Sequence, residues 1–171
     1  MKNRTLYLTL ALLIFIISGC GSKPYDGSDL VLKDGLLYRG NQAEPYTGKV
    51  IGKADFKTIE YYVLNGKKNG EFILRYRNNN VQMKGKIINN KNEGTWNYYY
   101  PDGVLESTGN FKNDLPDGIW KWFFGEGTLK ETGKFVAGKR EGKWLSYNSD
   151  GSLYISREFK ENIQVDSALA M

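Results

Sequence analysis

The side chains that could do chemistry in this sequence are carboxylates, because the other common catalytic groups are missing. The 171 residues include no histidine and a single cysteine, Cys20. Histidine triads, histidine-bearing zinc sites and imidazole acid–base catalysis are therefore excluded. Intramolecular disulfides and cysteine-cluster metal sites are excluded as well. What remains for general acid–base work is Asp102 and Asp150, with Glu126 in the equivalent position.

These carboxylates have a simpler structural interpretation. Asp102 and Asp150 each precede a glycine, and Asp-Gly is a preferred turn sequence. A second acidic series, Glu93, Asp117 and Glu141, stands directly before a repeated glycine and could form a row that binds a cation. We interpret this series instead as solvated turn residues or partners of nearby lysines. We therefore predict no catalytic residue, no metal, no cofactor and no enzymatic activity.

The N-terminus has the composition of an export signal. Lys2 and Arg4 are followed by an apolar run over residues 6–17, and then by Ser18, Gly19 and Cys20. The run is short of the roughly 20 apolar residues that a membrane-spanning helix needs. A basic start, a short apolar segment and small residues are typical of a secretory signal, which we predict over residues 1–19.

The stretch Ile17-Ser18-Gly19-Cys20 resembles the lipobox of bacterial lipoproteins. This resemblance implies cleavage before Cys20, a thioether-linked diacylglycerol on its sulfur and usually a further acyl chain such as palmitate. Several acyl chains anchor a protein stably where one does not. We expect an exported protein anchored to the bacterial cell membrane, with the choice of inner, outer or surface leaflet left open. An uncleaved N-terminal anchor and ordinary cleavage that leaves a free thiol are the alternatives.

The charge of the chain is weakly basic. The formal net charge is +5, and two of the positive charges, Lys2 and Arg4, belong to the predicted signal, so +3 remains after cleavage. A charge of this size favours loose attraction to anionic envelope surfaces. No stripe of arginine and lysine stands out, so we predict no nucleic-acid binding.

Residues 67–162 form four units of 24 residues without an insertion. Each unit carries a glycine, a large aromatic residue two positions later, a second glycine after a turn and a closing apolar residue. In chain order these columns are Gly70, Gly94, Gly118 and Gly142; Phe72, Trp96, Trp120 and Trp144; Gly85, Gly109 and Gly133, then Arg157; Ile87, Phe111, Phe135 and Phe159.

Each unit is predicted to be a β-hairpin, because apolar and polar residues alternate on both sides of a turn sequence. We expect a two-residue turn at Asp102-Gly103 in which both residues have positive φ. That turn predicts four cross-strand pairs: Tyr100 with Leu105, Tyr98 with Ser107, Trp96 with Gly109, and Gly94 with Phe111. The next unit predicts Trp120 with Gly133 and Gly118 with Phe135. We expect the ring of Trp96 to cover Gly109, and Arg157 to stack on Trp144.

The whole chain is predicted to be all-β, an antiparallel up-and-down β-meander built from these hairpins. Upstream of the repeats, residues 30–66 are predicted to form degenerate β-hairpins that begin with Asp34-Gly35. Residues 20–29 are predicted to be a lipidated tether and residues 163–171 a flexible tail. Repeats of this kind stack, because no unit buries its apolar face alone.

The repeated units resemble MORN repeats. The stretch from Gly133 to Trp144, followed by Tyr147 and Asp150-Gly151, is similar to that motif, and so is the stretch from Gly109 to Trp120. The closer resemblance is to the bacterial MORN-variant proteins of the YwqK family, which often carry the label of antitoxin component. It covers residues 44–162 and implies a curved single-layer sheet used for protein or lipid interaction.

One aromatic column is a candidate binding stripe. Tyr99, Phe123 and Tyr147 recur with the same period, and strand alternation directs them away from Trp96, Trp120 and Trp144. We therefore predict a membrane-anchored, non-enzymatic interaction scaffold whose partner is another envelope protein. A carbohydrate- or cell-wall-binding module that uses this column is the first alternative. An immunity or antitoxin-like protein is the second.

Overall fold

The computed structural model describes residues 26–54, 56–165 and 169–170. These residues form strands and turns, and none of them lies in a helix long and apolar enough to cross a membrane. The predicted signal over 1–19 and Cys20 lie outside the described residues. The strands are β1 (Leu30–Lys33), β2 (Leu36–Arg39), β3 (Gly48–Ala54), β4 (Lys57–Leu64), β5 (Lys67–Arg75), β6 (Val81–Ile88), β7 (Lys91–Tyr99), β8 (Leu105–Lys112), β9 (Leu115–Pro116), β10 (Gly118–Phe123), β11 (Leu129–Val136), β12 (Lys139–Tyr147), β13 (Leu153–Lys160), β14 (Ile163–Gln164) and β15 (Leu169–Ala170).

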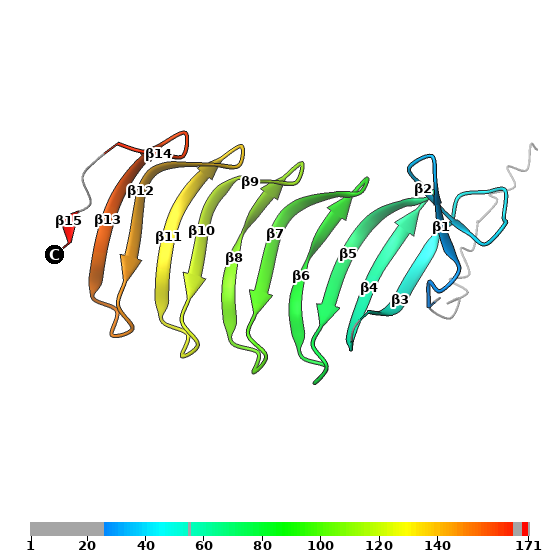
Figure 1. Ribbon diagram of the computed structural model, residues 1–171, viewed down its shortest axis with the longest axis horizontal. Coiled ribbons are helices and arrows are strands. Elements are labelled where there is room, and N and C mark those ends of the chain that lie inside the picture. Colours follow the sequence, from blue (N-terminus) through cyan, green and yellow to red (C-terminus); the bar gives the residue numbers. More distant parts are fainter. Residues whose placement is uncertain (1–25, 55, 166–168, 171) are drawn as a thin grey trace, which may run out of the picture.

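The strands follow one another in a single antiparallel meander. In the described part of the chain the main sheet has 13 strands, and neighbours in sequence are neighbours in space from β3 to β14. The short strand β9 pairs with β8, and β15 pairs with β13. Figure 1 shows the strands side by side in one curved row that does not close into a barrel. The predicted all-β, up-and-down, single-layer fold is confirmed.

The N-terminal segment closes one end of this row. The β1–β2 hairpin is bonded to the β4–β5 turn, because Leu37 N donates to Gly66 O at 2.8 Å. Gly27 packs against Val50, which together with Val63 is almost completely buried. The predicted tether over 20–29 is therefore wrong for its last four residues, which are part of the folded end.

The C-terminal end is covered in a different way. Residues 163–171 were expected to be a flexible tail, but β14 pairs with Phe159 and Lys160, and β15 pairs with Ile155 and Ser156. Both short strands lie along the outer edge of β13 (Figure 1). They satisfy part of a backbone edge that would otherwise be open to pairing with another chain.

The tip of each repeat hairpin is a three-residue loop, which corrects the predicted two-residue turn. Gly103 N donates to Tyr100 O at 2.9 Å, and Tyr100 N donates to Val104 O at 2.8 Å. Gly103 has a φ of 95°, whereas Asp102 has no positive φ. This is a type I turn followed by a glycine bulge. Because the bulge adds one residue, Leu105 pairs with Tyr99 rather than with Tyr100.

A second irregularity, between Tyr98 and Tyr99, restores the predicted register, so Tyr98 pairs with Ser107. Trp96 pairs with Gly109 and Gly94 with Phe111. In the next unit Trp120 pairs with Gly133 and Gly118 with Phe135.

Turns in which both central residues have positive φ occur at the other ends of the strands, where one hairpin joins the next. They lie along the upper rim of the sheet in Figure 1. Their φ values lie between 48° and 83°, as two-residue type I′ turns require. The pairs of central residues are Asn65-Gly66, Asn89-Asn90, Asn113-Asp114, Ala137-Gly138 and Glu161-Asn162.

These turns are hydrogen-bonded to one another along the rim. The second residue of each turn donates its N–H to a carbonyl of the preceding unit, as Asn90 does to Lys68 O at 2.9 Å and Gly138 to Pro116 O at 2.8 Å. Where that residue has a side-chain carbonyl or carboxylate, the side chain accepts in return, as Asp114 Oδ1 does from Asn92 N at 2.6 Å. The rim therefore couples neighbouring hairpins.

Three tryptophans, Trp96, Trp120 and Trp144, each lie over a glycine of the preceding hairpin, which corrects the predicted contact between Trp96 and Gly109. Trp96 has a glycine on both neighbouring strands, but its ring lies over Gly85. Gly109 is covered instead by Trp120, the tryptophan of the following hairpin, and a Cβ on Gly109 would overlap that ring. The indole N–H of Trp120 donates to Asn110 O at 3.1 Å and fixes this orientation.

The arrangement explains where the glycine column stops. Gly85, Gly109 and Gly133 are each covered by the tryptophan of the next unit. Arg157 occupies the fourth position of that column, and the residue 24 positions after Trp144 is Ala168 rather than another tryptophan. Upstream, the equivalent position is Tyr61, and its partner on the next strand is the smaller Phe72 rather than a tryptophan. A glycine therefore occurs wherever a tryptophan of the next unit must be accommodated.

We expect Gly109→Ala to lower the free energy of unfolding by about 1–3 kcal/mol, the usual cost of overpacking, because the new methyl group overlaps the Trp120 ring. Gly125→Ala is the matched control, since nothing lies within 4 Å of its added Cβ. Urea unfolding of the two variants measures the difference. Equal stability of the two would contradict the contact.

The chain itself supplies a rescue for a larger substitution. Gly109→Tyr combined with Trp120→Phe recreates the Tyr61–Phe72 pair. We expect the double variant to be more stable than the sum of the two single changes predicts, by about 0.5–3 kcal/mol for residues in contact. Additive effects in this double-mutant cycle would show that the two positions do not interact.

A stabilising change is expected in the rim. Ala137 has a φ of 48°, a left-handed conformation that costs alanine roughly 1–2 kcal/mol but that asparagine tolerates. Asn65, Asn89 and Asn113 occupy the same position in the preceding turns. Ala137→Asn should raise the melting temperature, whereas Ala137→Val should lower it. A fall with asparagine would mean that backbone conformation does not limit this turn.

Candidate functional site

The two faces of the sheet carry different kinds of side chain. We call the side of Trp96, Trp120 and Trp144 the indole face, and the other side the opposite face. On the indole face the columns of Gly94, Trp96, Gly109 and Phe111 keep one residue type in at least three of the four units, whereas the columns of Tyr98 and Ser107 do not. On the opposite face four columns change residue type along the sheet, and one column keeps an aromatic residue. The candidate site lies on the opposite face, which lacks the repeated glycine and tryptophan pattern.

The indole face is filled by its own side chains. Trp96, Trp120 and Trp144 are only 3%, 6% and 2% exposed. Ring contacts connect them along the sheet, and the edge-on pairs with the preceding phenylalanines are the closest, such as Phe135 with Trp144 at 5.0 Å between centroids. Half-buried Tyr98 lies beside them, and burial raises the pKa of its hydroxyl. This face is the core of the described part of the chain, in which no second layer covers the main sheet.

The opposite face presents four columns of non-repeating chemistry across the repeats. Reading from the first unit to the fourth, these columns are Lys84, Thr108, Thr132 and Ser156; Lys86, Asn110, Lys134 and Glu158; Glu71, Thr95, Ile119 and Lys143; Ile73, Asn97, Lys121 and Leu145. Their positions follow from the cross-strand register, which pairs Lys84 with Asn97 and Lys121 with Thr108.

The predicted aromatic column lies on this opposite face. Tyr99, Phe123 and Tyr147 are each half-buried. The Lys84 ammonium lies 5.8 Å from the centroid of the Tyr99 ring, which places Tyr99 on the side away from Trp96. In the described residues no ring contact joins the three to one another. Successive rings are two strands apart, a step of about 9–10 Å.

The backbone beneath this column is held by tyrosines of the hairpin tips. Tyr76 donates its hydroxyl to Tyr99 O at 2.7 Å, and Tyr100 donates to Phe123 O at 2.8 Å. Burial raises the pKa of the Tyr76 hydroxyl, which keeps this donor protonated. These bonds hold the backbone at Tyr99 and Phe123, two of the three residues of the column.

A shallow hollow of about 340 Å³ lies beside the column on the opposite face. Its polar lining comes from Glu71, Lys84, Lys86, Thr95 and Asn97, so both signs of charge are present. The hollow lacks the paired carboxylates or histidine that hydrolytic chemistry uses. Its surface is suited to hydrogen bonding with a partner.

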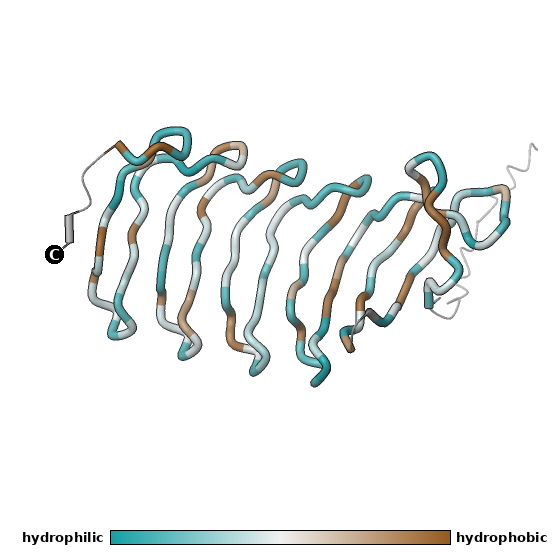
Figure 2. The backbone as a smooth tube through the Cα atoms, in the orientation of Figure 1, coloured by the Kyte–Doolittle hydropathy of each residue, from teal (hydrophilic) through white to brown (hydrophobic). Residues whose placement is uncertain are grey.

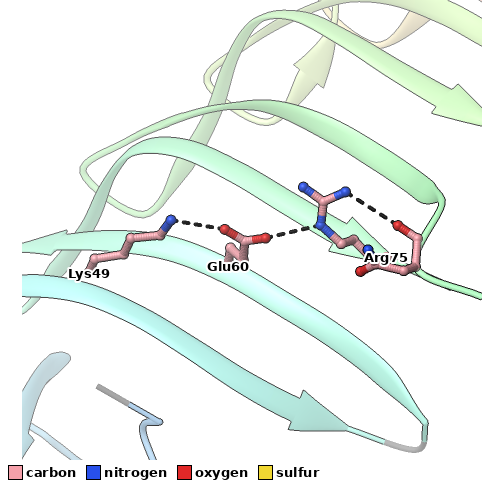
Figure 3. Close-up of polar contacts among 4 residues, drawn as sticks. Lys49, Glu60 and Arg75 are labelled. Carbon is pink, nitrogen blue, oxygen red and sulfur yellow. Dashed lines mark hydrogen bonds and ion pairs between the residues drawn. The ribbon is translucent and has the colours of Figure 1, made fainter. Parts of the chain in front are cut away.

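Three charged residues bridge the first strands of the sheet on the same face (Figure 3). Glu60 accepts from Lys49 Nζ at 2.9 Å and from Arg75 Nε at 3.0 Å, and its side chain is 17% exposed. These two partners, the lysine first, hold the pKa of Glu60 below its ordinary value of 4.5. Arg75 Nη1 also donates to Asn79 O at 3.4 Å in the hairpin tip. The sequence analysis missed this group, because its members come from three strands.

The carboxylates considered for catalysis have structural partners. Asp102 Oδ1 accepts from Val104 N at 3.0 Å. Asp150 Oδ1 accepts from the backbone N–H and the hydroxyl of Ser152, which lower its pKa. Glu126 contacts Thr128 Oγ1 at 3.5 Å. Each of them organises a separate hairpin tip.

The acidic series before the repeated glycines also bonds to backbone. Glu93 accepts from Asn113 N at 3.0 Å and Asp117 from Ala137 N at 3.3 Å. Glu141 accepts from Glu161 N at 3.0 Å. Each carboxylate thus caps the next turn of the rim, and the described residues contain no cluster that could hold a metal ion.

The residue that breaks the glycine column does not stack as expected. Arg157 pairs in register with Trp144, but the guanidinium over the Trp144 ring belongs to Arg140, 4.5 Å from the centroid. Arg140 also lies 5.3 Å from the centroid of Phe159. The prediction that Arg157 stacks on this indole is therefore wrong.

The fold and its two faces define an open, repeat-built β-sheet, a class of interaction module. A family model described as MORN repeat variant matches residues 92–113, 116–137 and 140–161. The three matches begin 24 residues apart and cover the last three predicted units. The chain thus contains three MORN repeat variants, and the β5–β6 hairpin continues the same pattern upstream. No curated protein matches the chain.

Acid should weaken the Glu60 group. Because its pKa is lowered on folding, the carboxylate stabilises the fold above its ordinary pKa of 4.5, and this stabilisation disappears as the pH falls through the lower folded value. We expect Glu60→Gln to reduce the acid dependence of the melting temperature. Glu71→Gln, an exposed neighbour, controls for the loss of one carboxylate. An unchanged acid profile in Glu60→Gln would exclude this contribution.

Proposed function

We propose that the protein is a non-enzymatic interaction scaffold of the bacterial envelope, held at the membrane through a lipidated Cys20. The opposite face binds another envelope protein. One observation carries this proposal: the glycine and tryptophan columns that build the indole face recur along the repeats, whereas four columns of the opposite face change chemistry along the sheet.

The contrast matters because both faces are built from the same strands. Packing explains the repetition of the glycine and tryptophan columns, since Trp96, Trp120 and Trp144 each lie over a glycine. No comparable packing demand acts on Lys84, Lys121 or Lys143, which are exposed. A surface whose chemistry changes every two strands suits a folded protein, because a folded protein also presents non-repeating chemistry.

A second candidate function is the binding of a glycan of the cell wall. Tyr99, Phe123 and Tyr147 form the column of the opposite face that keeps an aromatic residue in three successive units. They are partly exposed and regularly spaced, which would suit stacking on successive sugar rings. This candidate predicts that a repetitive ligand, rather than a protein, is lost when the column is removed.

The anchor has its own test. We expect the mature protein to begin at Cys20, to carry acyl chains and to stay in the membrane fraction. Cys20→Ser should shift the mass by the missing lipid and release the protein. Retention of Cys20→Ser in the membrane at its normal processed mass would rule out the lipid anchor.

The partner is tested by cross-linking in living cells. A triple variant, Tyr99→Ala/Phe123→Ala/Tyr147→Ala, should lose a specific protein that the wild type captures. The matched control is Tyr62→Ala/Tyr154→Ala, which removes two exposed tyrosines outside the column and should retain capture. Wall fragments captured in place of a protein would favour the glycan candidate. Equal capture by all three chains would exclude the column as the binding surface.

A further inference from the structure

The hollow beside the aromatic column lies where two hairpins join. Strand β6 of one hairpin pairs with β7 of the next, and three residues of β7, 94–96, stand opposite Gly85 alone. Such an excess of residues on one strand is a β-bulge, which redirects side chains and often lies next to a functional site. Here the bulge places Thr95 in the lining of the hollow, with Gly85 beside it.

The chemistry at this junction differs from that at the others. Each unit places two side chains of the opposite face at its junction with the preceding strands. From the first unit to the fourth these pairs are Glu71 with Ile73, Thr95 with Asn97, Ile119 with Lys121, and Lys143 with Leu145. Three of the pairs contain an aliphatic residue, whereas Thr95 and Asn97 both form hydrogen bonds. Figure 2 shows a hydrophobic stretch on β5 and none on β7. The β6–β7 junction is therefore suited to a polar ligand.

The side chains of Thr95 and Asn97 are held in place by partners on β8. Thr95 Oγ1 donates to Asn110 Oδ1 at 2.8 Å, and Thr108 Oγ1 donates to Asn97 Oδ1 at 2.8 Å. The carbonyl oxygen of Asn97 is thus bonded to a hydroxyl, and among the described residues no hydrogen bond uses its Nδ2 group. Asn97 therefore offers two N–H donors, and Thr95 offers a hydroxyl oxygen as acceptor.

The rest of the polar lining is charged. Lys84 and Lys86 are exposed, and in the described part of the chain neither forms an ion pair. Glu71, on β5, is exposed as well. The hollow thus combines two positive charges with one negative charge, which leaves an excess of +1. Because the Lys84 ammonium lies 5.8 Å from the centroid of the Tyr99 ring, this charge stands next to an aromatic surface.

We propose that this hollow binds one ring of an acidic sugar, a pyranose that carries a carboxylate. Its volume of about 340 Å³ lies within the range of small-molecule sites. Sugar hydroxyls both donate and accept hydrogen bonds, so they match a lining that mixes amide, hydroxyl and carboxylate groups. The carboxylate of the sugar pairs with the ammonium groups of Lys84 and Lys86.

Other ligands would use only part of this lining. A small anion, or the acidic side chains of a peptide, would pair with the two lysines but would give Glu71 no donor. A neutral sugar would leave both ammonium groups unpaired. An acidic sugar satisfies both sets of groups. The inference rests on the opposite face as the binding face in the proposed function, and it gives the glycan candidate a defined position beside Tyr99.

The test uses two sugars that differ only in the acidic group. The full chain in detergent micelles is titrated by calorimetry with a galacturonic acid trimer and with the neutral galactose trimer of the same linkage. A water-soluble acylating reagent then modifies exposed lysines, and mass spectrometry reports each site. Lys84 and Lys86 report on the hollow. Lys121, Lys134 and Lys143, exposed on the same face, are internal controls.

We expect the acidic trimer to bind about ten-fold more tightly than the neutral one, as hydrogen bonds to charged groups imply. Acylation of Lys84 and Lys86 should fall several-fold, with no change at the three control lysines. Lys86→Gln should remove most of the preference for the acidic trimer, whereas Asn97→Ala should weaken both. Lys134→Gln changes the same column in a later unit and should bind like the wild type. Melting temperatures verify that each variant is folded.

Other outcomes overturn the proposal. Failure of the acidic trimer to bind at millimolar concentration, or equal affinity for both trimers, would mean that the hollow does not select an acidic sugar. Equal binding of citrate or of an oligo-aspartate peptide, with the same protection, would mean that charge alone is recognised. Protection confined to the control lysines would place the sugar elsewhere on the face.

The hollow and the proposed function fail separately. Protein capture through the aromatic column, without binding of the acidic trimer, would overturn the sugar site and leave the proposed protein scaffold standing. Equal capture by the column variants in cells, together with protection of Lys84 and Lys86 by the acidic trimer, would overturn the proposed protein partner and support the hollow.

Discussion

The contact of each indole with a glycine of the preceding hairpin is the constraint on which the structure depends. A single-layer sheet has no second layer to cover its apolar face, so the cover must come from the side chains of that face. Trp120 lies flat over Gly109 because the glycine has no Cβ. The same contact joins one unit to the next, since the two residues belong to different hairpins. The indole–glycine contact therefore both covers the apolar face and holds neighbouring repeats together.

This self-coverage determines what the rest of the sheet can do. Since the indole face supplies the apolar core, the opposite face is released from packing and can vary along its length. The strand ends are held separately, by tyrosine hydroxyls at the hairpin tips and by the hydrogen-bonded turns at the rim. The protein therefore presents a surface of varying chemistry and a regular edge on one frame.

Much of the fold follows from the sequence, because the 24-residue period carries both the strand alternation and the cross-strand pairs. The direction in which the tryptophan rings lean does not follow from the sequence. Trp96 has Gly85 on one side and Gly109 on the other, and the repeat period does not show which of the two glycines its ring covers. The prediction of the tip turn was wrong for a similar reason, since the sequence Asp102-Gly103 fits both a two-residue turn and a type I turn with a glycine bulge.

The end of the glycine column at Arg157 has a consequence for how such chains change in length. Each glycine provides a place for the indole of the unit that follows, and the last unit provides none. A unit duplicated within the array would bring both halves of the contact with it and would lengthen the sheet by about 9–10 Å. A unit added after Arg157 would meet a side chain where its indole must lie. The array can therefore lengthen or shorten internally, whereas Arg157 opposes the addition of a unit at its C-terminal end. Insertion or deletion of whole units would change the distance from the N-terminal end to the last hairpin in equal steps.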